Sequence, residues 1–286
     1  MLRDLLDVLV DATRQSLRLR VEGRSTAPSV DPSWLVEAAD FEILRFEEGS
    51  TEVVCQTQSL AKASPETFAQ GDFFMPVDVE QSGLDVFEQT LSEVAAANED
   101  GEYYDDKILK TLGRFTKVFR HGVESIGFRD GVGISVRPED IETFSELKRS
   151  TPRPTEVRIA GRLDALTVSR RTFKLKLHEV GATVRGSFPR ELLDEFKELI
   201  GQRVVVSGQG TFKPSGKLRK IETRSVRPAA ERDQVWEKVP TARRTRVRPP
   251  DLRQPQSSEA GLHDLIGGWP GDESDDEIRQ ALEDLS

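Results

Sequence analysis

A chain of 286 residues, 36% hydrophobic and 32% charged, is long enough to bury a core in two folded domains. Its single cysteine, Cys55, excludes an intramolecular disulfide, and no apolar run reaches the roughly 18 residues that a membrane span needs. Asp4 and Asp7 would interrupt the apolar core of a secretion signal. We therefore expect a cytoplasmic protein with neither a membrane nor a disulfide-linked partner.

Residues 1–150 predict a mixed α+β domain. Leu2, Leu5 and Leu9 share one face of a first helix, and residues 17–21 are expected to continue as a strand. Cys55, in an apolar strand, is interpreted as a small buried side chain rather than a reactive thiol. The other expected elements are a hairpin of residues 41–46 and 51–56, helices at 65–69, 84–97 and 104–119, a second hairpin of 124–128 and 132–136, and a helix at 138–147.

Residues with catalytic potential are few. Asp105 and Asp106 lie at the beginning of an expected helix, where carboxylates stabilise the N-terminal dipole. A second acidic cluster is Glu99, Asp100 and Glu102. The three histidines fall in separate segments without a second ligand at metal-binding spacing, at positions 121, 178 and 263. We expect no catalytic site, no metal and no cofactor, and therefore a non-enzymatic protein. A hydrolase remains the alternative if Asp40, Asp72, Asp105 and Asp106 converge on one pocket.

The second expected hairpin contains several glycines, as a phosphate-binding loop does. Gly127, Gly131 and Gly133 surround a turn between two strands, where Asp-Gly supplies the positive φ that a hairpin needs. No helix follows at the spacing of a phosphate-binding loop. We interpret these glycines as turn residues.

Residues 151–228 predict a small closed barrel, with elements in the order β-β-β-α-β-β. Phe173, Leu175 and Leu177 alternate with polar residues, a period of two that a half-buried strand satisfies. Gly201 stands where a left-handed cap would end the helix. The expected strands cover residues 157–164, 172–177, 183–187, 203–209 and 217–226, and the helix covers 189–200.

This order of elements resembles the oligonucleotide/oligosaccharide-binding (OB) fold, over about a quarter of the chain. The resemblance is one of pattern, and another small barrel, such as an SH3-like one, is the structural alternative. In OB folds the ligand face is the outer surface of the second and third strands, with the loops that join strands one to two and four to five. The resemblance therefore implies a nucleic-acid-binding set of Arg170, Arg171, Lys174, Lys176, Arg185, Lys213, Lys217, Arg219 and Lys220.

Charge is divided unevenly along the chain. Residues 151–228 hold 17 Lys and Arg against 8 Asp and Glu, whereas residues 1–150 hold 16 against 29 and residues 229–286 hold 8 against 13. The basic surplus fits a nucleic-acid backbone, but the outward aromatic side chains on which bases stack are missing. The alternatives are a solvated basic face or a surface that docks the protein's own acidic regions.

The last part of the chain has two expected sections. Residues 229–260 are rich in Pro and Arg without periodicity, which predicts a disordered linker. Residues 261–286 predict an acidic amphipathic tail, in which Ser274 and Glu277 form a capping box. The helix they begin is too short to be stable alone, so it packs either on its own protein or on a partner.

The run from Trp269 to Ser286 resembles the endings of bacterial antitoxin-like proteins, which pair with ribonuclease toxins, often of the PIN type. This chain is longer than such proteins and has no recognisable short DNA-binding head. The resemblance implies a non-enzymatic binding protein whose tail holds a basic protein partner, such as a PIN-type ribonuclease toxin; the alternative is a nucleic-acid-binding protein acting through the barrel. The expected partner-binding residues are Trp269, Asp275, Asp276, Glu277, Ile278, Leu282 and Leu285.

Overall fold

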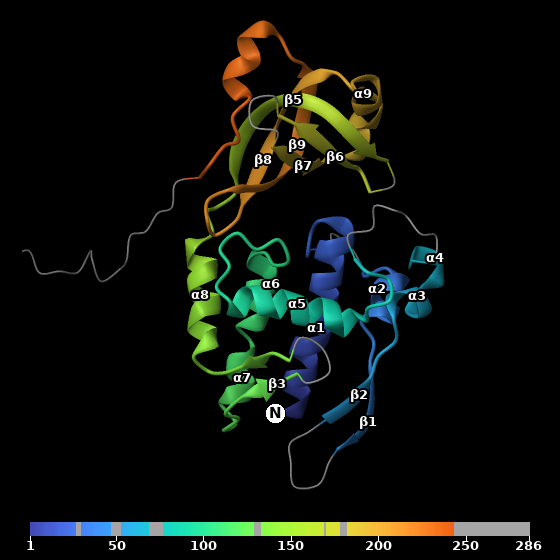
Figure 1. The fold of residues 1–286 in the computed structure, drawn as a ribbon, viewed down its shortest axis with the longest axis vertical. Coiled ribbons are helices and arrows are strands. Elements are labelled where there is room, and N and C mark those ends of the chain that lie inside the picture. The colour runs from blue at the N-terminus through green and yellow to red at the C-terminus, as the bar shows by residue number, and fades with distance from the viewer. Residues whose placement is uncertain are drawn as a thin grey trace, which may run out of the picture. The chain divides into compact units, whose positions relative to one another are not determined.

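The computed structural model describes residues 1–26, 30–46, 53–68, 77–128, 133–168, 170–177 and 182–242. They form a mixed α+β fold with a five-stranded mixed sheet (Figure 1), which confirms the expected class. The chain divides into residues 1–245 and 246–286, and the described residues all belong to the first of these. No helix in the described ranges is long and apolar enough to cross a membrane.

Helices dominate residues 1–150, and the longest, α1, packs against α2, α5, α6 and α7. Two short antiparallel hairpins, β1–β2 and β3–β4, lie among them. The largest core cluster of this region includes Leu9, Phe87, Tyr104, Phe115 and Phe144. The elements are α1 (Leu2–Glu22), α2 (Ser33–Ala38), β1 (Glu42–Phe46), β2 (Val53–Gln56), α3 (Leu60–Ala63), α4 (Pro65–Phe68), α5 (Gly83–Ala95), α6 (Asp106–Leu112), α7 (Phe115–Phe119), β3 (Ile126–Gly127), β4 (Ser135–Val136) and α8 (Asp140–Ser150).

The strand expected at residues 17–21 is wrong, because α1 continues without interruption to Glu22. This stretch is buried on two sides of the helix: Leu19 belongs to the cluster of α5 and α6, whereas Leu17 and Val21 belong to a second cluster with Leu35. Burial on both sides produces an apolar alternation that imitates a strand. Gly23, in the left-handed conformation, ends the helix.

The single helix expected at residues 104–119 is two helices, α6 and α7. Between them the backbone N–H groups of Arg114 and Lys117 donate to carbonyls three residues back, the pattern of a tighter 3₁₀ turn. The hydroxyl of Thr116 also donates to the Gly113 carbonyl. The expected hairpins and the helix near residues 84–97 are present with shifted ends, while α2 and α3 were not expected.

Residues 155–228 form the five-stranded sheet, which closes on itself as a barrel in the order β5-β6-β7-β9-β8. β7 pairs in parallel with β9, and the other neighbours are antiparallel. Gly201 has φ +77°, the left-handed conformation expected after the helix. The elements are β5 (Thr155–Thr167), β6 (Thr172–Lys176), β7 (Thr183–Ser187), the 3₁₀ turn η1 (Arg190–Leu192), α9 (Leu193–Glu198), β8 (Arg203–Phe212) and β9 (Leu218–Pro228).

Three aromatic rings fill the barrel core beneath α9. Phe196 on α9 is fully buried and stacks on Phe188 at 4.4 Å between ring centroids, and Phe173 of β6 lies 4.9 Å from Phe196. The inward positions predicted for β6, Phe173, Leu175 and Leu177, are all buried. The α-helix between the third and fourth strands therefore covers one end of the barrel core.

The linker expected from residue 229 is wrong for residues 229–242, which pack on the barrel. They include the 3₁₀ helix η2 (Glu231–Trp236), which contacts β5. The buried Asp233 accepts two hydrogen bonds from Arg227, and the buried Glu237 pairs with Arg203. Ion pairs with barrel arginines thus order a segment that lacks apolar periodicity. Residues 243–286, which hold the rest of the expected linker and the tail residues from Trp269 to Leu285, lie outside the described residues.

Candidate functional site

The nine barrel residues expected to bind nucleic acid fall into two groups. One group lies on or next to β6 and β7: Arg170, Arg171, Lys174, Lys176 and Arg185. The other lies on the hairpin of β8 and β9: Lys213, Lys217, Arg219 and Lys220. The two groups have different surroundings.

The outer surface of β6 and β7 carries cations in direct register. Lys174 lies opposite Arg185, and Lys176 lies opposite Arg162 of β5. All four side chains are exposed, and we call them the basic strand face. Within the described ranges Lys174 and Lys176 make no ion pair, and like charges that face each other across strands destabilise a sheet. The arrangement is therefore unfavourable for folding and favourable for binding an anion.

Aromatic side chains are absent from the outward positions of β6 and β7, which hold Thr172, Lys174, Lys176, Thr183, Arg185 and Ser187. Phe173, the aromatic residue of β6, points into the core. A base would thus find no ring to stack on between these two strands. The basic strand face can contact phosphates but offers no base recognition.

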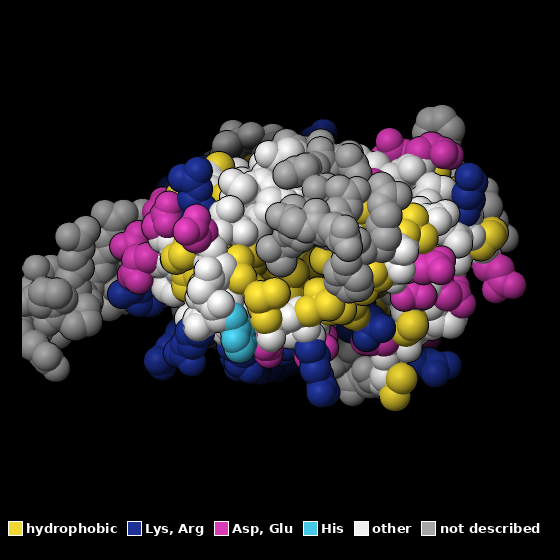
Figure 2. Space-filling model, turned by 90° about the horizontal axis from the view of Figure 1, so that it is seen from below, with side chains coloured by type: hydrophobic (Ala, Val, Ile, Leu, Met, Phe, Trp, Pro, Cys, Tyr) yellow, Lys and Arg dark blue, Asp and Glu magenta, His cyan; other side chains and the backbone are white. Residues whose placement is uncertain are grey.

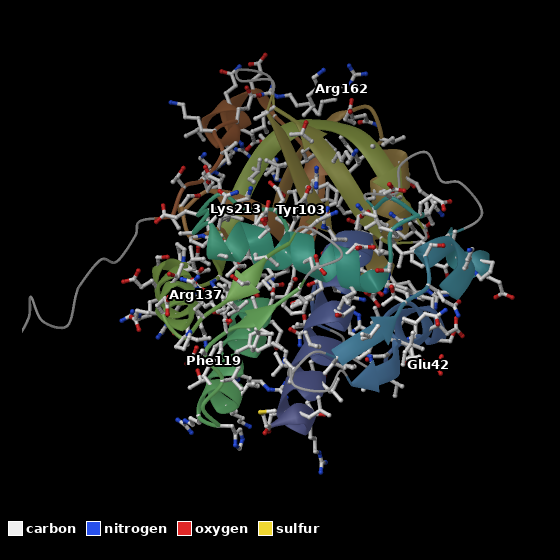
Figure 3. The ribbon with its side chains drawn as sticks, turned by 60° about the horizontal axis from the view of Figure 1, so that its bottom comes forward. Glu42, Tyr103, Phe119, Arg137, Arg162 and Lys213 are labelled. Carbon is white, nitrogen blue, oxygen red and sulfur yellow. The ribbon has the colours of Figure 1, made fainter. Side chains whose placement is uncertain are left out.

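The hairpin group binds the chain's own acidic loop, which we define as residues 97–105 between α5 and α6. Lys213, which Figure 3 labels together with Tyr103 of this loop, is buried, donates to the Asp100 carbonyl at 2.9 Å and pairs with the Glu102 carboxylate. Lys217 pairs with the Asp100 carboxylate. Arg219 donates to the carbonyls of Gly101 at 3.1 Å and Glu102 at 3.3 Å. We call these contacts the loop–hairpin latch.

The acidic loop is held in shape by its own contacts. The Tyr104 hydroxyl donates to the Asn98 carbonyl, and the Tyr103 N–H donates to Glu93 at 2.8 Å. Gly101 has no room for a side chain, because a Cβ there would lie 2.4 Å from the Tyr104 ring. Burial raises the pKa of Tyr104, so its hydroxyl remains a donor at neutral pH. The loop therefore presents Asp100 and Glu102 from a fixed backbone.

Ionised carboxylates are favoured in the latch. The hydrogen bond from Lys217 lowers the pKa of Asp100. Burial opposes ionisation of Glu102, but the hydrogen bond and charge of Lys213, with Arg219 and Arg185, outweigh it and lower the pKa of Glu102. Lys220, the fourth member of the group, pairs with Glu222 of the same strand. Three of the nine residues expected to bind nucleic acid thus contact the protein's own acidic loop. Docking of the protein's own acidic regions is one of the alternatives given above for the basic surplus.

One of the residues considered for hydrolysis, Asp105, has a clear structural role. Asp105 caps α6 by accepting from the N–H groups of Lys107 and Ile108, and it accepts from the Ser25 hydroxyl at 2.6 Å. Among the described residues, no group of three or more His, Cys, Asp or Glu side chains is placed to hold a metal. Cys55 is half-buried, and burial raises the pKa of its thiol. Asp72, His178 and His263 lie outside the described ranges.

A second basic feature was not singled out from the sequence. Lys110, Arg114, Lys117 and Arg120 follow one another at intervals of four, three and three residues, so they share one side of α6 and α7. The helical spacing of these cations was available in the sequence. The net acidity of residues 1–150 hides this local row of cations in the charge count.

Comparison with known proteins does not indicate a function. No protein-family model matches the chain, and no curated protein is similar to it. The function therefore has to be argued from the residues of the site.

Proposed function

We propose that this protein binds single-stranded nucleic acid without sequence preference, through the basic strand face of an OB-type barrel. The observation that carries this proposal is the direct pairing of Lys174 with Arg185 and of Lys176 with Arg162 on one exposed surface. Cross-strand cations lower the stability of the sheet, whereas a chain of phosphates placed along them would reverse that cost.

The topology of the barrel supports the OB assignment. The first strand pairs with both the second and the fourth, and the α-helix lies between the third and fourth strands. On that assignment β6 and β7 are the ligand-binding strands, and the β8–β9 hairpin forms one of the flanking loops. Because the acidic loop binds this hairpin, the available surface is short, so we expect few phosphate contacts and a correspondingly shallow salt dependence.

Reversing two charges on the basic strand face tests this proposal. The double variant Lys174→Glu, Lys176→Glu is expected to bind a fluorescent oligothymidylate at least about tenfold more weakly at low salt, because two phosphate contacts are lost and two repulsions gained. The slope of log affinity against log salt, which is negative, should also become shallower by about 1.4. Fluorescence anisotropy at several salt concentrations measures both quantities.

The matched control is Arg190→Glu with Lys197→Glu, which makes the same change of charge at exposed positions of η1 and α9. It should retain most of the affinity. Equal losses in both double variants would mean that only net charge matters, and an intact protein that does not bind the oligonucleotide removes the proposal.

The second proposal concerns the tail, residues 261–286, as an anchor for a basic protein partner such as a PIN-type ribonuclease toxin. The sequence pattern behind it is Ser274 and Glu277 at the spacing of a capping box, followed by Ile278, Leu282 and Leu285 at i, i+4 and i+7 with acids between them. Deleting residues 262–286 is expected to abolish co-purification of the product of the adjacent gene and to leave the melting temperature nearly unchanged. A large fall in melting temperature would instead indicate that the tail stabilises its own protein.

A further inference from the structure

A cleft of about 360 Å³ lies between α6, α7 and α8, and no barrel residue lines it. Its size falls within the range of about 300–1,000 Å³ that small-molecule sites occupy. None of its ten lining residues is acidic and half are cationic, namely Lys110, Arg114, Lys117, Arg120 and Lys148. In the view from below, Lys and Arg side chains gather along one edge of the molecule (Figure 2). The cleft is thus a concentration of positive charge in a region, residues 1–150, whose net charge is negative.

The rest of the lining is either buried or small. Leu109 and Phe144 are only 2% and 1% exposed, so they offer almost no apolar surface to an occupant. Gly113, Thr116 and Ser145 complete the lining, and their short side chains leave space among the longer cationic ones. An occupant would therefore meet mainly ammonium and guanidinium groups, so charge and hydrogen bonds would decide its recognition.

Most of these cations have no acidic partner in the fold. Arg114 pairs with Asp11, but the other four form no ion pair with any residue that the structure describes. The single acidic residue of α6 and the three of α8 all lie outside the lining. Because like charges three and four residues apart on a helix repel one another, the row of cations lowers the stability of the helices. A bound anion would remove that cost.

Helix dipoles explain part of this positive charge. Lys110, Lys117 and Lys148 lie in the last turns of α6, α7 and α8, where a cation is favoured. Arg114 lies instead at the N-cap of α7, where the dipole disfavours a cation. The dipoles also give no reason for five cations to line one cleft without an acid. A ligand supplies that reason.

We infer that this cleft binds a small ligand that carries two or more adjacent phosphate groups. Adjacent phosphates hold several negative charges within a few ångströms and accept charge-assisted hydrogen bonds from Lys and Arg, whereas a single carboxylate would leave most of the five cations unpaired. Lys148 of α8 lines the cleft together with the row of cations on α6 and α7, so the cations surround a compact space. A compact group of phosphates fits this space better than the extended backbone of a nucleic acid does. The site is independent of the basic strand face.

Titration calorimetry on the full chain with inorganic tripolyphosphate tests the inference. In about 0.15 M salt, exposed charges more than about 8 Å apart are largely screened, so general attraction to the surface contributes little. We expect saturable binding of one tripolyphosphate per chain. The double variant Lys117→Gln, Lys148→Gln should bind it at least about tenfold more weakly, because two charge-assisted hydrogen bonds are lost. Both lysines are exposed, so the fold should be retained, and circular dichroism checks this.

Two controls separate a specific cleft from general charge attraction. Lys62→Gln with Lys238→Gln removes the same charge at exposed positions outside the cleft and should leave the affinity within about twofold. Inorganic phosphate should bind the wild-type chain at least about tenfold more weakly than tripolyphosphate, because a single phosphate contacts fewer of the cations. The inference is overturned by a lack of saturable tripolyphosphate binding, by equal losses in the two double variants, or by equal affinity for the two anions.

Oligonucleotide binding distinguishes this inference from the proposed function. Lys174→Glu with Lys176→Glu should weaken oligothymidylate binding and leave tripolyphosphate binding unchanged, and the cleft variant should do the opposite. If the cleft variant instead loses oligothymidylate binding and keeps tripolyphosphate binding, the cleft is a nucleic-acid surface and the inference is wrong. If the wild-type chain binds tripolyphosphate but not the oligonucleotide, the inference holds and the proposed function fails.

Discussion

Replacing Phe196 by alanine should lower the free energy of unfolding by about 3–5 kcal/mol, the usual cost of removing a large buried aromatic side chain. Phe196 is fully buried and is in ring contact with Phe188 and Phe173. Its removal leaves a cavity between α9 and the barrel that the closed sheet cannot collapse to fill. Urea denaturation followed by tryptophan fluorescence and circular dichroism measures the loss.

The conservative variant Phe196→Leu separates loss of volume from loss of the ring. It fills most of the space and should cost clearly less than the alanine variant. If alanine at this position changes the free energy of unfolding by less than about 1 kcal/mol, Phe196 does not join α9 to the barrel core as described.

The barrel could be predicted from sequence because its signals are local. Inward Phe173, Leu175 and Leu177 alternate with outward polar residues over one strand, and the expected third strand at residues 183–187 has the same bounds as β7. Turn and cap residues such as Gly201 added independent evidence at the ends of elements. Each of these features depends on neighbours within a few residues.

Expectations failed where the pattern depended on distant packing. Residues 17–21 looked like a strand because α1 is buried against two separate clusters. Residues 229–242 looked like linker because their order comes from ion pairs, such as Arg203 with Glu237, rather than from an apolar stripe. Periodicity reports burial on one face and contains no information about which charges meet.

The candidate site shows the same division. Lys174 and Lys176 could be placed on an outer surface from the phase of β6 alone. The different role of Lys213 could not be foreseen, because its partner Asp100 is 113 residues away in the chain. The sequence identified a basic set, and only the fold divides that set into an exposed face and a latch.

The latch leads to the second large effect. Lys213→Met is expected to lower the free energy of unfolding by about 1.5–3 kcal/mol, the range for hydrogen bonds to charged groups, because it removes the partner of Glu102 and of the Asp100 carbonyl. The matched control is Lys217→Met, whose ion pair with Asp100 is exposed and should contribute less than about 1 kcal/mol. Chemical denaturation of both variants gives the comparison. Equal effects of the two would contradict a larger contribution from the buried Lys213.

Acid should weaken this latch in the wild-type chain. The pKa values of Asp100 and Glu102 are lowered in the folded state, so their contribution is full above the ordinary carboxyl pKa of about 4 and is lost as pH falls through the lowered folded values. Once Glu102 is protonated it carries no charge, so the positive charge of Lys213 no longer gives it an advantage over methionine next to that carboxyl group. The difference in free energy of unfolding between wild type and Lys213→Met should therefore narrow below about pH 4. The protection of the Ser215 amide, which donates to the Glu99 carbonyl, relative to its intrinsic exchange rate at each pH should fall over the same range. A difference that stays constant between neutral and acidic pH would mean that the carboxylates contribute nothing to the contact.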